Sequence, residues 1–125
     1  MKIFSITYNN FTFGTKRTFK KLFEKCTYSG EQFEQHDTRT IEHIIPQSEG
    51  GKDEYSNYLV VKRTWNQRRS SIPLDTFILN NPQVEKNIID TINSMEGKNI
   101  EGINWSEEVK KTLIKAIGRD IFSQK

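Results

Sequence analysis

Two residues that could do chemistry together, Glu42 and His43, stand side by side at the end of an apolar run. A histidine side chain is mostly neutral at pH 7 and can accept a proton from water. A glutamate carboxylate is a suitable ligand for a hard divalent ion, and Asn66 offers an amide oxygen of the same kind further along the chain. These three side chains could therefore activate a water molecule beside a bound cation.

Two predicted strands and a loop would have to bring these side chains together. Residues 38–45 are β-branched and apolar, which predicts a strand that Pro46 ends. The polar residues 48–54 include two glycines and predict a loop. Residues 58–62 predict a second strand, and the two strands are close enough in the sequence to be neighbours.

A short helix is expected to follow the second strand. Thr64 is a suitable N-cap for this helix, which would carry Asn66 and end before Pro73. Adjacent residues in a strand point to opposite faces, so Glu42 and His43 diverge unless the strand ends or bends there. If they diverge, Glu42 can bind the ion while His43 acts on water, and the helix closes the site from the other side.

The rest of the chain predicts further helices, which together with the strands indicate an α+β fold. Residues 2–13 alternate between apolar and polar and predict a hairpin, after which Thr15 or Thr18 could cap a helix to about Lys25. Further helices are expected over residues 74–80, over residues 82–95 and from a Ser106 cap to Gly118, with residues 97–104 as a loop.

Positive charge is concentrated next to these residues. Residues 55–74 contain four basic residues and no acidic one, so their charge of +4 leaves −1 for the remainder of a chain whose net charge is +3. A polyanion such as a phosphate backbone would bind such a surface. The four residues are Lys62, Arg63, Arg68 and Arg69. A second basic cluster, residues 16–21, could contact the same partner or simply form a solvated helix face.

The length of 125 residues fits one compact domain. With Cys26 as its only cysteine, the chain can form no internal disulfide, which favours a cytoplasmic protein. No apolar run approaches the roughly 20 residues of a membrane span, and the first residues are too polar for a secretory signal. We therefore expect no membrane partner.

The segment EHIIPQSEGGKDEYSNYLVVKRTWNQRR resembles the HNH endonuclease family. His43, Asn57 and Asn66 match the three signature positions. The resemblance implies a ββα-metal core over about residues 26–74 with a helical extension over about 75–125. It also implies that Glu42 and Asn66 are metal ligands, that His43 is the general base, and that Asn57 braces the loop and helps to fix the histidine. Arg68 or Arg69 matches a basic position often used on phosphate.

The resemblance further implies one divalent ion, Mg²⁺ or Mn²⁺, as the cofactor. Many family members also hold a structural zinc with two cysteine pairs. Here Cys26 and Ser29 stand at the first pair and no cysteine lies near Trp65, so no structural zinc is expected. Trp65 and Tyr28 are expected to brace the finger by apolar packing. His36 is expected to be a solvated loop residue.

The function predicted from the sequence is a metal-dependent endonuclease that hydrolyses phosphodiester bonds of DNA, with double-stranded DNA as the expected partner. Two alternatives stay open. The first is a binding module that holds nucleic acid without cutting it. The second is a nuclease subunit, as a homodimer or with a protein partner, that is active only within a defence or mobile-element system. Asn57 could also be only a turn residue, and Asn66 only a surface residue.

Overall fold

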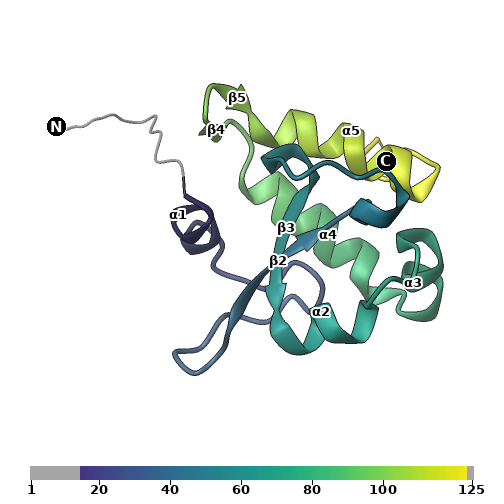
Figure 1. Ribbon diagram of the computed structural model, residues 1–125, viewed down its shortest axis with the longest axis horizontal. Helices are drawn as coiled ribbons and strands as arrows, with labels where there is room; N and C mark the ends of the chain where they lie inside the picture. Colours follow the sequence, from purple (N-terminus) through teal and green to yellow (C-terminus); the bar gives the residue numbers. More distant parts are fainter. Residues whose placement is uncertain (1–14, 124–125) are drawn as a thin grey trace, which may run out of the picture.

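A computed structural model describes residues 15–123, so the hairpin expected over residues 2–13 lies outside the described residues. The elements of the first part are α1 (Lys16–Lys21), β2 (Arg39–His43), β3 (Tyr58–Lys62) and α2 (Arg63–Arg69), with short 3₁₀ turns η1 (Gln47–Glu49) and η2 (Tyr55–Asn57) between the strands. They are followed by α3 (Leu74–Asn80), α4 (Gln83–Ser94), β4 (Asn99–Ile100), β5 (Ile103–Asn104) and α5 (Trp105–Ile117). Helices with two small antiparallel sheets confirm the α+β class (Figure 1).

The antiparallel pair β2–β3 forms the centre of the molecule in Figure 1, and α2 follows β3 without a loop. The register places His43 opposite Tyr58 and Arg39 opposite Lys62. β3 has the predicted bounds, whereas β2 is shorter than the predicted strand. It ends at His43, beyond which the Ile44 N–H donates to the Asn57 carbonyl at 2.9 Å. The strand therefore ends at the residue where the sequence required an end or a bend.

The predicted N-caps of α1 and α2 differ in outcome. Thr15 is the N-cap of α1, and its hydroxyl accepts from the Thr18 N–H at 3.0 Å, as one of the two expected caps. α2 begins at Arg63, so Thr64 lies inside the helix and the predicted cap is wrong. The Arg63 N–H donates instead to the Thr38 carbonyl at 3.0 Å, because the strand segment lies close enough to satisfy it.

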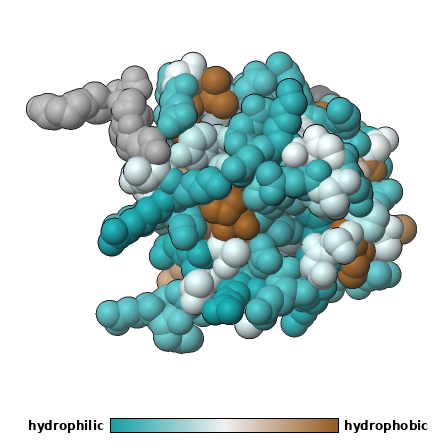
Figure 2. Space-filling model, viewed as in Figure 1, coloured by the Kyte–Doolittle hydropathy of each residue, from teal (hydrophilic) through white to brown (hydrophobic). Residues whose placement is uncertain are grey.

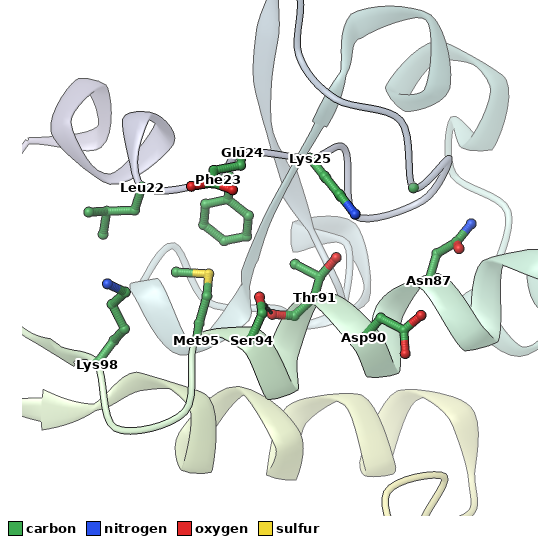
Figure 3. Close-up of a pocket in the computed structure, with 11 residues that line it drawn as sticks. Leu22, Phe23, Glu24, Lys25, Asn87, Asp90, Thr91, Ser94, Met95 and Lys98 are labelled. Carbon is green, nitrogen blue, oxygen red and sulfur yellow. Dashed lines mark hydrogen bonds between the residues drawn. The ribbon is translucent and has the colours of Figure 1, made fainter.

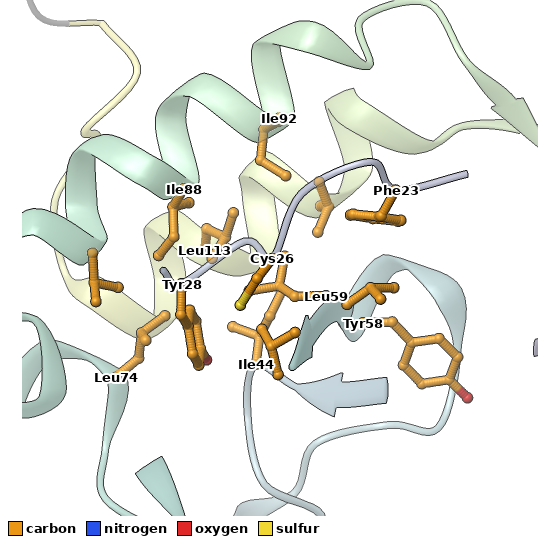
Figure 4. Packing of buried hydrophobic residues seen from close by; sticks show 14 of the residues in the cluster. Phe23, Cys26, Tyr28, Ile44, Tyr58, Leu59, Leu74, Ile88, Ile92 and Leu113 are labelled. Atoms are coloured by element: carbon orange, nitrogen blue, oxygen red, sulfur yellow. The ribbon is translucent and has the colours of Figure 1, made fainter. Parts of the chain in front are cut away.

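The C-terminal helices pack against the sheet and close one continuous core. Figure 4 shows side chains of β3, α4 and α5 meeting around Cys26 and Tyr28. The Trp105 indole N–H donates to the Tyr55 carbonyl at 2.8 Å, which ties the start of α5 to η2. The helices over 74–80 and 82–95 match α3 and α4 closely, but the expected loop over residues 97–104 contains the hairpin β4–β5. α5 begins at Trp105, one residue before the cap that was predicted.

The surface seen in Figure 2 is mostly hydrophilic, with small apolar areas separated from one another. Leu79 is the most exposed large apolar side chain of the described residues. Among residues 15–123, no helix is both long and apolar enough to cross a lipid bilayer.

Candidate active site

An open pocket of about 340 Å³ lies where β2 ends and α2 passes beside it. Three of the residues selected from the sequence, Glu42, His43 and Asn66, line this pocket together. Its other lining residues are Thr40, Ile41, Pro46, Gln47, Ser70 and Ser71. The carboxylate, the imidazole and the amide therefore meet in one place although Asn66 lies 24 residues after Glu42 in the sequence.

Glu42 and Asn66 are in direct contact. The Asn66 Nδ2 donates to Glu42 Oε1 at 3.0 Å, and a longer bond of 3.3 Å joins it to the Ile41 carbonyl. The Glu42 side chain is inward-facing, since only 5% of the residue is exposed. The two side chains therefore meet through the amide nitrogen of Asn66 and one carboxylate oxygen of Glu42. Among the described residues no cluster of three His, Cys, Asp or Glu side chains surrounds this point.

The second oxygen of Glu42 belongs to a buried polar network. Oε2 accepts from the Tyr28 hydroxyl at 2.7 Å and from Arg69 Nη1 at 3.0 Å. Burial raises the pKa of Glu42 above its ordinary value of 4.5, against the opposite effect of Tyr28 and Arg69. Burial also raises the pKa of Tyr28 well above 10, so its hydroxyl stays a neutral donor. This network fixes the direction of the carboxylate and leaves Oε1 toward the pocket.

Arg69 lies inside the protein, although the sequence predicts it to be a nucleic-acid contact. Only 1% of the residue is exposed, so the expected contact with a phosphate backbone is wrong for this side chain. The physical reason is the buried carboxylate of Glu42, which requires a cationic partner. The remaining donors of the guanidinium are satisfied by the carbonyls of His43, Ile44 and Ile72 at 2.8–3.0 Å.

His43 is only partly covered, with 26% of its side chain exposed. Its Nε2 lies 3.0 Å from Asp53 Oδ1, and its ring meets the Tyr58 ring edge to face with 5.2 Å between centroids. The same Asp53 oxygen accepts a short bond from the Tyr58 hydroxyl, and Lys16 Nζ lies 3.3 Å away. These donors, the Tyr58 hydroxyl first, lower the pKa of Asp53 from 3.8 to about 2.

Sequence reasoning did not identify Asp53. The residue stands in a polar loop, and its composition alone gives no reason to select one of several acidic residues there. The only available signal was position, since a loop that joins two paired strands has to return beside His43 and Tyr58.

Asn57 is buried and joins the two ends of the loop between the strands. Its Oδ1 accepts from the Ile45 N–H at 2.9 Å. Its Nδ2 donates to the carbonyls of Ile45 and Lys52 at 3.0 and 2.9 Å. An amide is needed here because one end of the side chain must accept while the other donates twice. This geometry agrees with the bracing role that the family resemblance implies.

Gly51 approaches the same corner of the loop. A Cβ atom at this position would lie 1.7 Å from the Ile45 carbonyl oxygen, which leaves no space for any side chain. Gly50 beside it has open space but a φ of 91°. The two glycines of the loop are thus required for different reasons, one for space and one for backbone conformation.

The other basic residues predicted to contact nucleic acid differ in how exposed and how paired they are. Lys62 is 16% exposed and pairs with Glu31 and Asp37 at 3.2 and 3.3 Å, so neighbouring carboxylates neutralise its charge. Arg63 and Arg68 are exposed, and within residues 15–123 neither has a carboxylate partner. The Arg68 guanidinium lies over the Trp65 ring at 4.0 Å.

Tyr28 and Trp65 lie beside Phe77 of α3, with ring centroids 5.2 and 6.3 Å away, as expected for apolar bracing. Cys26 is fully buried. Its sulfur accepts from the backbone N–H groups of Ser29 and Lys62 at 3.4 and 3.2 Å. Contacts of this kind join the segment before β2 to the end of β3.

A larger hollow of about 430 Å³ lies between α4 and the segment after α1 (Figure 3). Lys25, Asp90, Asn87 and Lys98 are among the polar side chains around it, and Phe23 and Met95 line its apolar part. It shares no lining residue with the pocket that contains His43. The residues selected from the sequence therefore line the smaller of these two pockets.

Comparison with known protein families finds a match for the segment that contains this site. The profile of a family described as HNH endonuclease matches residues 26–72, somewhat over a third of the chain. The match includes β2, β3 and α2 and ends before α3. No curated protein and no solved structure matches the chain significantly.

Proposed function

Because the profile of a family described as HNH endonuclease matches residues 26–72, we propose that this protein is a metal-dependent endonuclease that hydrolyses phosphodiester bonds of DNA. One observation carries the proposal: the Glu42 carboxylate and the Asn66 amide meet within hydrogen-bond distance in a pocket that His43 also lines. That combination supplies a cation site and a base at one point of the surface, which is what phosphodiester hydrolysis needs.

In this proposal His43 is the general base. Its Nε2 faces Asp53, so the nitrogen available to a water molecule in the pocket is Nδ1. Glu42 and Asn66 would hold one divalent ion, Mg²⁺ or Mn²⁺, which when bound supplies positive charge to the phosphate and the leaving oxygen. Arg69 and Tyr28 act only through Glu42, because they orient its carboxylate.

Asn66 now turns the nitrogen of its amide toward Glu42. A cation shared by the two residues requires the amide oxygen in that direction, so the amide has to rotate and give up its bonds to Glu42 and Ile41. The bond to the Ile41 carbonyl is neutral and worth about 1 kcal/mol, and the bond to the Glu42 carboxylate is charge-assisted and worth about 1.5–3 kcal/mol. Coordination of the cation by the amide oxygen would have to offset the loss of both.

Nucleic acid would lie across the exposed cations at the sides of the pocket. Arg63 and Arg68 on α2 are exposed and have no acidic partner among the described residues, so they are the proposed phosphate contacts of the matched segment. On α1, Arg17 and Lys21 are also exposed. Such contacts position the substrate and carry no sequence information by themselves. We propose double-stranded DNA as the substrate.

Cleavage of supercoiled plasmid tests the proposal. With Mg²⁺ or Mn²⁺ the protein is expected to nick or linearise the plasmid, and a chelator should stop the reaction. His43→Ala should lower the rate by about 10²–10⁴-fold, since it removes the general base. His36→Ala is the matched control, because the other histidine of the chain has an 83% exposed side chain and does not line the pocket.

The outcome also separates the two alternatives. A protein that binds DNA equally well with and without chelator but never cleaves it is a binding module. A protein that cleaves only after a second component is added is a subunit of a larger system. Equal cleavage by His43→Ala and His36→Ala would remove the catalytic role of His43.

A further inference from the structure

We propose that Asp53 is a positioning residue for His43, which holds the imidazole by its Nε2–H and keeps Nδ1 free to accept a proton. The inference rests on the proposed function, since it concerns how the base of that reaction is prepared. It adds to the site a residue that the sequence motif does not include.

The first support is the convergence of three donors on one carboxylate. His43 Nε2 lies 3.0 Å from Asp53 Oδ1, the Tyr58 hydroxyl donates to the same oxygen, and Lys16 Nζ lies 3.3 and 3.4 Å from the two oxygens. The donors come from three elements, namely the end of β2, the start of β3 and α1. A side chain in an otherwise exposed loop is therefore held in one place by groups that surround it.

The second support is the arrangement of the imidazole. Tyr58 lies opposite His43 in the register of the sheet, and its ring packs against the imidazole edge to face. A carboxylate accepts a hydrogen bond from Nε2 only if that nitrogen carries the proton. The neutral ring then has its lone pair on Nδ1, which has no hydrogen-bond partner among the described residues. One ring nitrogen is thus assigned to the protein and the other to the substrate side.

The proton balance of the step follows from this assignment. A water molecule gives a proton to His43 Nδ1 while the water oxygen bonds to phosphorus. The bond between phosphorus and the leaving oxygen breaks, and its electron pair stays on the leaving oxygen. The ring becomes an imidazolium with a proton on each nitrogen. Asp53 remains ionised beside it and stabilises that positive charge, as the carboxylate does in other His–Asp pairs.

Lys16 extends the site beyond the segment that the family profile matches. Thr15 caps α1 so that Lys16 is its first residue, and the Lys16 ammonium also lies 5.2 Å from the centre of the Tyr58 ring. α1 therefore contributes a third donor to the loop carboxylate. Removal of Lys16 should loosen Asp53, whereas His43 itself would lose no contact.

The first experiment reads the imidazole directly and needs no activity. In a His36→Gln background His43 is the only histidine, so long-range ¹H–¹⁵N spectra at pH 8 show which ring nitrogen carries the proton. The parent protein is expected to show the Nε2–H form alone. Asp53→Ala should give a mixture of both forms, and Glu54→Ala, which removes the same charge from the neighbouring exposed residue, should not. Identical spectra for parent and Asp53→Ala would overturn the proposal.

The second experiment measures cleavage. Asp53→Ala is expected to lower kcat by about 10–100-fold while the KM for DNA and the affinity for Mn²⁺ stay nearly unchanged, a loss typical of residues that orient a functional group. Asp53→Asn keeps an acceptor oxygen and should recover part of the loss. Equal kcat values for Asp53→Ala and Glu54→Ala would contradict the inference. If the wild-type protein cleaves no DNA, the proposed function fails, and the spectra still decide the role of Asp53.

Discussion

The guanidinium of Arg69 and the carboxylate of Glu42 form an ion pair in the interior, with 3.0 Å between Nη1 and Oε2. Three backbone carbonyls, two at the end of β2 and one before α3, accept the other donors of the arginine. Desolvation of two charges is costly, and only such complete hydrogen bonding makes a buried pair tolerable. This arginine thus fixes the carboxylate and also joins the ends of three chain segments.

Replacement of Arg69 should be strongly destabilising. Arg69→Met leaves the Glu42 carboxylate buried without a cation, which we expect to lower the free energy of unfolding by about 3–5 kcal/mol in urea titrations. Arg68→Met is the matched control on the same helix. Its side chain is exposed and stacks on Trp65, so a loss below about 1 kcal/mol is expected. Similar losses for the two variants would show that loss of the buried ion pair does not destabilise the protein more than loss of an exposed arginine.

The two glycines of the loop should respond differently to alanine. At Gly51 a Cβ atom would overlap the Ile45 carbonyl oxygen, so Gly51→Ala has to displace the backbone and should cost at least about 3 kcal/mol. Gly50→Ala meets only the penalty of positive φ, about 1–2 kcal/mol. Urea unfolding of both variants tests the order, and a larger loss for Gly50→Ala would contradict it.

Ser70 is expected to be a site of backbone strain. It ends α2 with φ 51° and ψ −126°, a conformation that favours glycine, and it lines the pocket beside Asn66. Ser70→Gly should therefore raise the free energy of unfolding by about 1 kcal/mol. Ser71→Gly is the control, since Ser71 is not among the described residues with positive φ, and it should give no gain. If the Ser70→Gly protein is less stable than the wild type, the backbone at Ser70 is not strained.

Stability in acid should depend on Asp53. Its pKa in the folded protein is about 2 instead of the ordinary 3.8, so above pH 4 its stabilising contribution is complete. As the pH falls from 4 to 2 the unfolded chain takes up the proton first, and that contribution is lost. Melting temperatures of Asp53→Asn should consequently fall less steeply than those of wild type in this range. Burial raises the pKa of Glu42, so protonation of Glu42 changes the stability in the opposite direction. This effect is the same in both proteins and does not alter the comparison. Parallel curves would contradict the prediction.

Binding to DNA should show which cations face the phosphates. Arg63→Ala and Arg68→Ala should each reduce the slope of log K against log salt concentration by about 1. Lys62→Ala should change the slope less, because Glu31 and Asp37 already neutralise this lysine. Binding measured by fluorescence anisotropy in chelator avoids cleavage. An effect of Lys62→Ala equal to that of Arg63→Ala would show that the ion pairs open on binding.

Elements fixed by local chemistry were predictable from the sequence. The apolar run that begins at residue 58 and the prolines at positions 73 and 82 predict β3 and α3 with the observed bounds. The β4–β5 hairpin was missed because its turn uses Glu101 and Gly102, both with positive φ, where asparagine before glycine is the usual signal. The caps of α2 and α5 are Lys62 and Asn104, each two residues before the predicted cap.

The parts of the site that depend on distant partners could not be predicted. The meeting of Glu42, His43 and Asn66 followed from the order of strands and helix, whereas the role of Asp53 depends on Lys16, far away in the sequence. The burial of Arg69 could not be predicted either. Neighbouring residues of a helix point about 100° apart, so Arg68 and Arg69 point in different directions, but both could still be exposed. What turns Arg69 inward is the buried carboxylate of Glu42, which lies 27 residues before it in the sequence.

The buried thiol of Cys26 is a natural probe of local opening in this protein. As the chain's single thiol, it cannot react with a labelling reagent while the segment before β2 remains closed over β3. The rate of modification therefore reports how often this part of the molecule opens, without any added probe. Slower labelling in the presence of Mn²⁺ or DNA would show that ligand binding at the pocket reduces the opening of the segment that covers Cys26.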